Sequence, residues 1–481
     1  MRYVILLLLV CLGFSCNSQA KSPDETPATT IGAPLEAPDI HIQVQGLPSG
    51  TAYLVGHYAE QRFRADSAAV DTKGQFTFQR AEPYQPGFYF VYMPDNTALQ
   101  VLIDADQTFS LKTQAGDLIG AMQAEGSLDN ELLYRNLKFE QEIQPKFQSV
   151  SERMKAAGEG SPIYAQLKAQ QEQLIAQRKA HIKEFTDNYP DAFFTKFKIA
   201  GQNPDVKDVR NPDGSVNTQL QVYYYRTEFW GNVDFSDERL LYTPVIYNKL
   251  NRYITELTVQ NPDSIIASTG QLMQKATGHD EYFKFFANWI TLNYDPEKTS
   301  LMDPQAIFVY MIQNYFTYER AFWSDSVQIF GLQQRAHEMA ASLVGKKGPN
   351  VTAKDPSGQL RSIYDLKAPY VIVYMYNPTC EHCMEQTPKL IQLYYEWRNK
   401  GLDVYGIAVD TDDAEWKDYI AKTGMPWTNV FDPTNKAIYT KYYVDITPEI
   451  YVLGPDRTII AKNLKVNQIP EVIERDKAKR H

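Results

Sequence analysis

Two cysteines, Cys380 and Cys383, directly follow a nearly continuous apolar run from Tyr370 to Tyr376, and this arrangement strongly constrains the fold. A run of this kind predicts a strand that is buried on both faces of a sheet. The segment after the cysteines has helical periodicity up to about Gly401, so the dithiol is expected at the start of a helix. A buried strand that leads into a helix in this way predicts an α/β domain.

The rest of the C-terminal segment repeats strands and helices in the same manner. Strands are expected at Val351 to Lys354, Val404 to Val409, Glu449 to Leu453 and Ile459 to Ile460, and helices at Glu415 to Lys422 and from Ile469 onward. Within such a pattern, a Cys-x-x-Cys pair between a strand and a helix is typical of a thioredoxin-like redox motif.

The chemistry expected of the two sulfurs follows from their positions. Free N–H groups at a helix N-terminus favour a thiolate at Cys380, and Cys383, one turn later, should be a buried thiol. Cys380 is therefore predicted to attack a disulfide and Cys383 to resolve the mixed disulfide. The remaining cysteines, Cys11 and Cys16, lie in or just after an apolar leader, so the folded body has no third thiol for a structural disulfide.

A second motif, Thr447-Pro448, stands directly before the predicted strand at Glu449. Proteins with a thioredoxin-like fold carry a cis-proline at this place, and X-Pro is the bond that adopts cis at modest cost. Thr447 and Pro448 are therefore predicted to border the substrate groove, where an extended chain can pair with the backbone.

The two residues between the cysteines are expected to tune the reduction potential. Glu381 should disfavour the Cys380 thiolate, whereas a cationic His382 would favour it. Because the two effects oppose one another, the sequence leaves the potential open. No metal is expected, since a structural zinc site needs four ligands and no second Cys or His pair lies near the dithiol.

The first residues predict export. A short basic start and the apolar run Val4 to Leu12 have the size of a secretory signal, and Cys16 follows in a lipobox-like context. We expect a signal peptide over 1–16 with lipidation at Cys16; the alternative is cleavage after Ala20, which would release a soluble protein. Residues 17–39 lack periodicity and predict a flexible tether. The mature protein is expected in the cell envelope or periplasm, as an outer-membrane or inner-membrane lipoprotein.

The chain is long enough for about three domains. Period-two runs predict an antiparallel β-sandwich over 40–125, helical periodicity predicts an α-helical domain over 126–342, and the α/β pattern extends over 343–481. The net charge of −10 and the lack of a basic stripe argue against nucleic acid as a partner.

Aromatic residues are abundant in the helical region. A set of them could line a groove for peptide or glycan, although core packing is the interpretation that their helical spacing favours. The set is Tyr223, Tyr224, Tyr225, Phe229, Trp230, Phe322 and Trp323.

The C-terminal third resembles the TlpA/ResA-type thiol-disulfide oxidoreductases of the thioredoxin fold. The motifs that carry the resemblance are Val344 to Pro349, Asp355 to Gln359, Tyr364 to Lys367, the dithiol with Pro388 after it, Pro426-Trp427 and Thr447-Pro448. The upstream regions resemble the β-rich DUF4369-type and helical DUF5106-type modules of Bacteroidetes lipoproteins, the latter through Phe235 to Pro244 and Asn261 to Ile265.

The resemblance implies an envelope reductase of protein disulfides that needs no cofactor beyond the Cys380–Cys383 disulfide. It also implies protein thiol or disulfide clients and an upstream membrane thiol reductant. The sequence departs from the family pattern at Thr379, where tryptophan is common, and at Gln386, where glutamate is frequent. Tyr374 replaces the buried acid of thioredoxin itself, so no residue is assigned to proton relay.

Two alternative functions remain. A peroxiredoxin-like thiol peroxidase is suggested by Pro378-Thr379-Cys380, although the spacing differs from that of peroxiredoxins and no activating basic residue is evident. The chain could also be a binding or scaffold lipoprotein whose redox domain is accessory.

Overall fold

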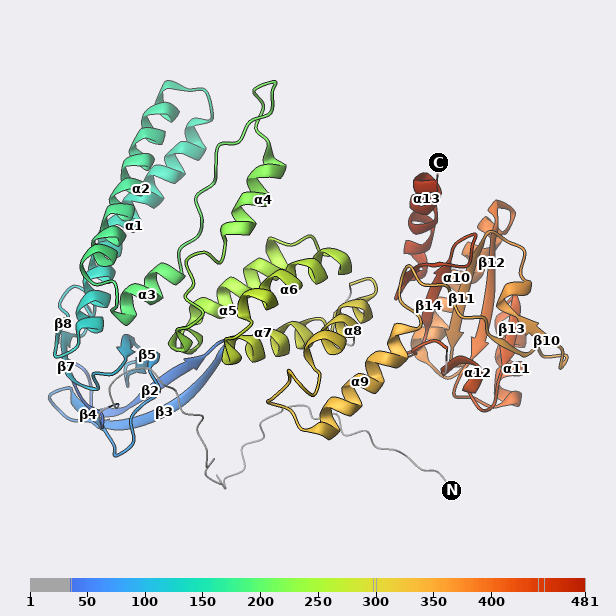
Figure 1. The fold of residues 1–481 in the computed structure, drawn as a ribbon, viewed down its shortest axis with the longest axis horizontal. Helices are drawn as coiled ribbons and strands as arrows, with labels where there is room; N and C mark the ends of the chain where they lie inside the picture. Colours follow the sequence, from blue (N-terminus) through green and yellow to red (C-terminus); the bar gives the residue numbers. More distant parts are fainter. Residues whose placement is uncertain are drawn as a thin grey trace.

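The computed structural model describes residues 35, 37–296, 298–299, 301–439, 441–444 and 446–480. The predicted signal segment, Cys16 and most of the predicted tether lie outside these residues. Figure 1 shows a β-rich part near the start of the described chain, a helical middle part and a separate α/β part at the C-terminal end. This order agrees with the predicted fold class.

The N-terminal part consists of two packed sheets. Their strand orders are β4-β1-β7-β8 and β3-β2-β5-β6. The strands are β1 (Asp39–Gln45), β2 (Gly50–Tyr58), β3 (Gln61–Val70), β4 (Gln75–Gln79), β5 (Gly87–Tyr92), β6 (Ala98–Ile103), β7 (Thr108–Gln114) and β8 (Gln123–Glu125). Alternate residues such as Ile40, Ile42 and Val44 point into the core between the sheets.

Two features of this part differ from the period-two prediction. The first sheet is not wholly antiparallel, because β1 lies between β4 and β7 and pairs with β7 in parallel, with Ile40 opposite Phe109. Strand β3 was not predicted from the sequence. It is an edge strand whose residues, including Arg62 and Arg64, are mostly exposed, so it lacks the apolar alternation that marks a half-buried strand.

The middle part is helical. Its elements are α1 (Leu128–Ala157), α2 (Pro162–Asn188), α3 (Phe193–Ala200), α4 (Thr218–Glu228), η1 (Glu238–Tyr242), α5 (Pro244–Asn251), η2 (Arg252–Glu256), α6 (Pro262–Ala276), α7 (Asp280–Asn293), α8 (Pro304–Tyr315) and α9 (Ser326–Ala340). Helix α2 is capped at its start, with Ser161 Oγ accepting a hydrogen bond from Tyr164 N and Pro162 in the first turn.

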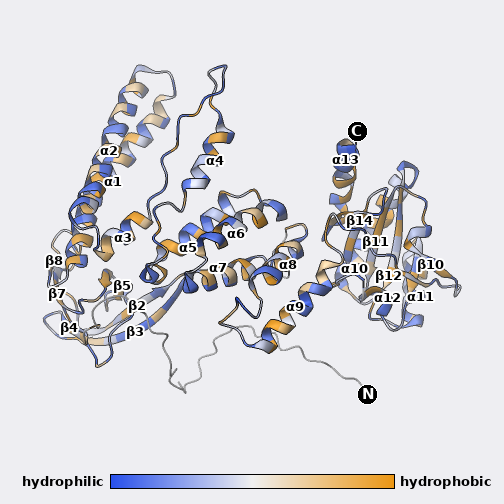
Figure 2. Cartoon of the chain, in the orientation of Figure 1, coloured by the Kyte–Doolittle hydropathy of each residue, from blue (hydrophilic) through white to orange (hydrophobic). Residues whose placement is uncertain are grey.

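Helices α1 and α2 form a long antiparallel arm that stands out from the body (Figure 1). Hydrophobic and hydrophilic residues are interleaved along both helices (Figure 2), as expected for amphipathic helices that pack against each other. A small core of Ile143, Val150, Leu167 and Leu174 lies between them.

The interpretation of the aromatic set as core packing holds for only part of it. Phe229 and Trp230 are buried in the large core of the helical part. Tyr223, Tyr224 and Phe322 are exposed, and for these three the packing interpretation is wrong. Helical spacing alone did not distinguish the two groups, because exposure depends on which face of each helix meets a neighbour.

The C-terminal part is a mixed sheet between helices, in the order β10-β9-β13-β12-β11-β14-β15. Its strands are β9 (Thr352–Lys354), β10 (Leu360–Ser362), β11 (Tyr370–Tyr376), β12 (Leu402–Ala408), β13 (Thr428–Phe431), β14 (Glu449–Leu453) and β15 (Ile459–Lys462). Its helical segments are η3 (Ile363–Asp365), α10 (Glu381–Trp397), η4 (Arg398–Lys400), α11 (Asp413–Thr423), α12 (Lys436–Tyr439), η5 (Val466–Gln468) and α13 (Ile469–Arg480).

Strand β11 lies in the interior of this sheet. It pairs in parallel with β12 and antiparallel with β14, and every residue in it is buried, as its continuous apolar sequence predicts. One face of the sheet packs against α10, α11 and α13, and the other packs against Ile363, Ile438 and Tyr442. The predicted α/β architecture of this domain is confirmed.

A buried polar cluster joins the helical part to the α/β part. Lys462 on β15 is 0% exposed, and its Nζ donates to Ser342 O at 3.2 Å and lies 3.8 Å from Asp303 Oδ1. Asp303 also accepts a hydrogen bond from Val344 N at 2.7 Å. Burial raises the pKa of the Asp303 carboxyl, and the charge of Lys462 acts in the opposite direction.

Replacement of Lys462 by methionine should destabilise the protein, because the Asp303 carboxylate would lose a buried cation. We expect a loss of about 3 kcal/mol in the free energy of unfolding, measured by urea denaturation. Without the lysine the pKa of Asp303 in the folded state rises further above its value in the unfolded chain. The loss should therefore be larger at pH 8 than at pH 5. Lys168→Met, on the exposed side of α2, is the matched control; an equal loss at both pH values would contradict the assignment.

Candidate active site around Cys380 and Cys383

The loop between β11 and α10 places Cys380 at the N-cap of the helix. Cys380 Sγ accepts a hydrogen bond from Cys383 N at 3.3 Å. Asn377 shapes the loop: its Oδ1 accepts from Thr379 N at 2.8 Å, and its Nδ2 donates to Asp410 O at 3.0 Å. The dithiol therefore stands at the carboxyl end of a central strand, where α/β sheets commonly place their sites.

The two sulfurs differ in exposure. Cys380 is partly exposed, whereas Cys383, in the first turn of α10, is fully buried, and both are free thiols in this structure. Only Cys380 is accessible to a partner protein. This is the arrangement expected for one attacking and one resolving sulfur.

The two thiols also differ in acidity. Burial acts to raise the pKa of Cys380, but hydrogen bonds from Thr447, from Cys383 and from the backbone N–H of His382 outweigh it, so the net shift is downward. Burial, together with the neighbouring Cys380, raises the pKa of Cys383 to about 12. At neutral pH the thiolate is therefore concentrated on the accessible sulfur.

Thr447 and Pro448 lie opposite the dithiol, as the sequence predicts. Cys380 Sγ donates to Thr447 O at 3.1 Å, and the Thr447–Pro448 peptide is cis. The Thr447 side chain is also among the groups that lower the pKa of Cys380. Residues 67 positions apart in the sequence thus meet at the sulfur.

Exposed apolar residues lie next to both partners of this contact in the sequence. Met384 follows Cys383 on α10 and is 50% exposed, and Ile446 precedes Thr447 and is 66% exposed. Glu381 and His382, the predicted tuning residues, are exposed in the first turn of α10.

A chain of buried hydroxyl groups, which the sequence did not reveal, lies behind the dithiol. Tyr374 OH is 2.8 Å from Thr387 Oγ1, which is 2.9 Å from Tyr419 OH. Cys383 is near enough to contribute to the raised pKa values of Tyr374 and Tyr419, whose main cause is burial. Thr387 lies one helical turn after Cys383, and no local sequence pattern links it to Tyr374 or Tyr419.

Glu449 is a second residue that sequence analysis missed. It follows Pro448 directly, is buried, and accepts a hydrogen bond from Asn463 Nδ2 at 3.0 Å. The next residue, Ile450, packs in the same core as Cys383, whereas Tyr451 packs on the other face of the sheet. Because neighbouring strand residues face opposite sides, Glu449 lies on the side away from Cys383.

Within the described residues no group of His, Cys, Asp and Glu side chains is arranged to hold a metal ion. In the same part of the chain no helix is long and apolar enough to cross a membrane.

The acidity of the two thiols predicts a distinct pH profile for alkylation. The rate at which iodoacetamide modifies Cys380 should reach half of its maximum at a pH below about 8.5, the pKa of an ordinary thiol. Cys383 should react slowly at every pH up to 9. Because the pKa is lowered, the reactive thiolate persists to lower pH and is lost as the pH falls through that midpoint. Thr447→Val should move the midpoint upward, since one donor is lost. Mass spectrometry of the labelled peptides measures both sites, and a wild-type midpoint above 8.5 would contradict the profile.

Family models match three successive parts of the chain. Residues 39–133 match DUF4369, a domain of unknown function, and residues 166–328 match DUF5106, also a domain of unknown function. Residues 344–462, which contain the dithiol and Thr447–Pro448, match the AhpC/TSA family.

Curated relatives match the C-terminal part of the chain. The thiol-disulfide oxidoreductases ResA of Bacillus thuringiensis (strain Al Hakam) and Bacillus anthracis are 25% identical over 117 residues, which is 24% of this chain and 67% of each relative. ResA of Bacillus thuringiensis subsp. konkukian (strain 97-27) is 24% identical over 131 residues, 27% of this chain and 75% of the relative.

Similar solved structures include a domain of a possible thiol-disulfide isomerase from Cytophaga hutchinsonii ATCC 33406. It is 33% identical, with a TM-score of 0.27, and the match covers 29% of this chain and 96% of that one. A thioredoxin-like protein from Bacteroides caccae ATCC 43185 is 17% identical, with a TM-score of 0.43. The match covers 57% of this chain and 99% of the Bacteroides caccae chain.

The family models and the curated relatives agree with the α/β architecture of the C-terminal part. An oxidoreductase of this kind acts on thiols or disulfides. The chain carries DUF4369 and DUF5106 domains ahead of a C-terminal domain that matches the AhpC/TSA family and is similar to the thiol-disulfide oxidoreductase ResA.

Proposed function

We propose that the protein reduces protein disulfides in the cell envelope through the Cys380–Cys383 dithiol. The observation that carries the proposal is the contrast between the two sulfurs at the start of α10. Cys380 is accessible and has a lowered pKa, whereas Cys383 is buried and has a raised one. An attacking thiolate and a protected resolving thiol need these properties.

The reaction has two exchange steps. The Cys380 thiolate attacks one sulfur of the client disulfide, forms a mixed disulfide, and releases the other client sulfur as a thiolate that takes up a proton. Cys383 then gives up its proton and attacks Cys380 Sγ, which releases the second client thiol and leaves a Cys380–Cys383 disulfide. The client gains two electrons, and an upstream membrane thiol reductant returns the dithiol to its reduced form.

The contact between Cys380 and Thr447 supports a polypeptide as the client. Thr447 lies beside the sulfur and precedes the cis-proline Pro448, and an extended backbone running past them can pair with the chain at this edge. Met384 and Ile446, both exposed and next to Cys383 and Thr447 in the sequence, offer apolar contacts to such a client. Glu381 and His382 are the residues that we expect to tune the potential, because they are the charged or ionisable side chains of the first turn.

The cellular location that we propose rests on the N-terminal sequence. An apolar leader followed by Cys16 supports export and a lipid anchor, which would hold the redox domain at an outer-membrane or inner-membrane surface. Cys16→Ala should move the protein from the membrane fraction to the soluble fraction. A variant that stays in the membrane fraction unchanged would contradict the anchor.

The function is tested by comparing two assays on the wild-type protein. Reduction of insulin disulfides with dithiothreitol as electron donor should proceed well above the uncatalysed rate, and consumption of hydrogen peroxide should not. The pKa of Cys380 is lowered mainly by Thr447, Cys383 and backbone N–H groups, without an arginine or lysine among the largest contributors, and this disfavours the peroxidase. Absence of turnover in both assays would favour the scaffold, and peroxide turnover alone would favour the peroxidase.

A further inference from the structure

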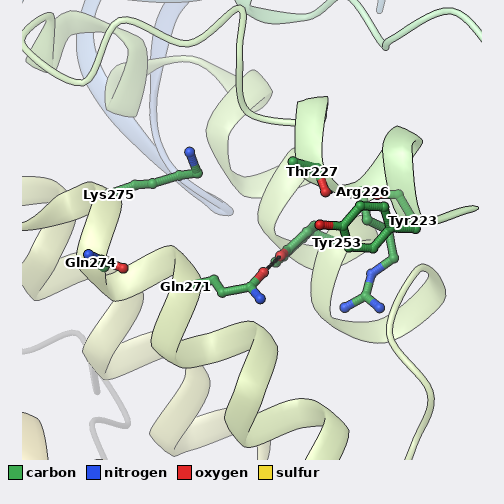
Figure 3. A pocket seen from close by; sticks show the side chains of 7 residues that line it. All are labelled: Tyr223, Arg226, Thr227, Tyr253, Gln271, Gln274 and Lys275. Carbon is green, nitrogen blue, oxygen red and sulfur yellow. Dashed lines mark hydrogen bonds between the residues drawn. The ribbon is translucent and has the colours of Figure 1, made fainter.

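A groove in the helical part, far along the chain from the dithiol, has the properties of a binding site. It has a volume of about 580 Å³ and lies between α4, η2 and α6. Figure 3 shows Lys275, Gln274 and Gln271 along one helix, opposite Thr227, Arg226 and Tyr223, with Tyr253 between them.

The groove is positively charged although the chain as a whole carries a net charge of −10. Its lining includes two cations, Arg226 and Lys275, and no aspartate or glutamate. Within the described part of the chain neither cation has a carboxylate within 4.0 Å, whereas many other surface lysines and arginines do. Two uncompensated cations in one groove favour an anionic ligand.

Arg226 is held in place by neutral partners. Its Nη2 donates to Ser268 Oγ at 2.6 Å and lies 3.4 Å from Thr258 Oγ1, and both hydroxyl groups are buried. Its Nε is buried and, among the described residues, has no hydrogen-bond partner. The guanidinium is thus fixed before a ligand arrives, and its positive charge is not cancelled by the protein.

The opposite wall offers amide groups in a line. Gln274 and Lys275 come three and four residues after Gln271 on α6, so each lies on the same side of the helix as Gln271, and all three are exposed. Gln271 Oε1 is 3.4 Å from Tyr253 OH. Side-chain amides both donate and accept hydrogen bonds, as the backbone of a bound peptide requires.

Helix α4, which forms the other wall, presents apolar side chains without covering them. None of its residues is buried, and Leu220, Tyr223 and Tyr224 are exposed, with Tyr223 at 61%. Tyr223 and Tyr224 come three and four positions after Leu220, so each lies on the same side of the helix as Leu220. An exposed face of this kind next to a charged groove indicates an interaction surface.

We propose that this groove binds an acidic polypeptide segment, with a carboxylate of the ligand near Arg226 and Lys275. Gln271 and Gln274 hydrogen-bond its backbone, and its apolar side chains pack on Tyr223 and Leu220. The lining side chains are mostly exposed, which suits an extended chain better than an enclosed small molecule. The choice of a polypeptide rests on the proposed function, because it would hold a protein client while the dithiol reacts with it.

Binding can be measured by fluorescence anisotropy with dye-labelled octapeptides and the full chain. A peptide of alternating glutamate and leucine should bind more tightly than the glutamine–leucine and lysine–leucine peptides, and its affinity should fall as salt is raised. Lys275→Glu and Tyr223→Ser, both at exposed positions, should each weaken binding by about fivefold or more. Lys168→Glu on α2 makes the same charge change away from the groove and should leave the affinity unchanged.

Each result separates the alternatives. Equal binding of the three peptides, or an equal effect of Lys168→Glu and Lys275→Glu, would overturn the proposal. Binding of trigalacturonate, an anionic oligosaccharide, without binding of the peptides would also overturn the proposal. Insulin reduction, measured on the same proteins, distinguishes the two proposals. If the wild-type protein reduces insulin but does not bind the peptides, only the groove site is contradicted. If it binds the peptides but does not reduce insulin, only the proposed function is contradicted.

Discussion

Replacement of Cys380 by serine is expected to reduce the rate of insulin-disulfide reduction by at least about a thousandfold. A serine hydroxyl is hardly ionised at neutral pH, and it cannot form the mixed disulfide on which the reaction depends. Of the two cysteines in the described residues, a protein client can reach only the partly exposed Cys380, because Cys383 is fully buried. Turbidity of precipitating insulin B chain, with dithiothreitol as the electron donor, gives the rate.

The control for this substitution is Thr379→Ser, one residue earlier in the same loop. Serine can keep the hydrogen bond that the Thr379 hydroxyl donates to Asn377 Oδ1 at 2.7 Å, so the loop should be preserved and the rate should stay within about twofold. Urea denaturation of both variants shows whether they remain folded. A folded Cys380→Ser variant that still reduces insulin at the wild-type rate would contradict the assignment of Cys380 as the attacking sulfur.

Features of the redox domain that depend on local sequence could be predicted. Strand β11 follows from seven consecutive apolar residues, and the position of Cys380 at the helix start follows from the periodicity after it. The contact between Cys380 and Thr447 spans 67 residues, and it was expected because the order of strands and helices matched a known motif. Local pattern and motif together were sufficient to place Cys380 at the helix start and Thr447 beside it.

Features that depend on tertiary packing could not be predicted. The hydroxyl chain of Tyr374, Thr387 and Tyr419 joins three elements, and nothing in the sequence near any one of them indicates the other two. A glutamate side chain is usually exposed, but Glu449 is buried in the sheet. Likewise, Tyr223 and Phe229 belong to the same set of aromatic residues in the sequence. The packing of α4 leaves Tyr223 exposed and Phe229, at the end of the helix, buried.

Replacement of Cys383 by serine should stop the reaction after its first step. Cys380 keeps its accessible thiolate and attacks the client, but the resolving sulfur is gone, so the mixed disulfide accumulates. Serine is close in size to cysteine, so the fully buried site should tolerate it. In the absence of added reductant we expect a covalent adduct with insulin chains on non-reducing gels, together with a loss of catalytic turnover of about a hundredfold or more.

Two further variants show which sulfur carries the adduct. The double variant Cys380→Ser/Cys383→Ser should form none, and dithiothreitol should release the adduct of Cys383→Ser completely. If Cys380→Ser instead traps the client, the attacking role belongs to Cys383, and its burial must be relieved in the reactive state. The raised pKa of Cys383, about 12, argues against that outcome, because burial, its main cause, remains in the variant, and a thiol that hardly ionises at neutral pH is a poor nucleophile. The same raised pKa requires that the second step begin by removing the Cys383 proton. Resolution of the wild-type mixed disulfide should therefore become faster as the pH rises from 6 to 9.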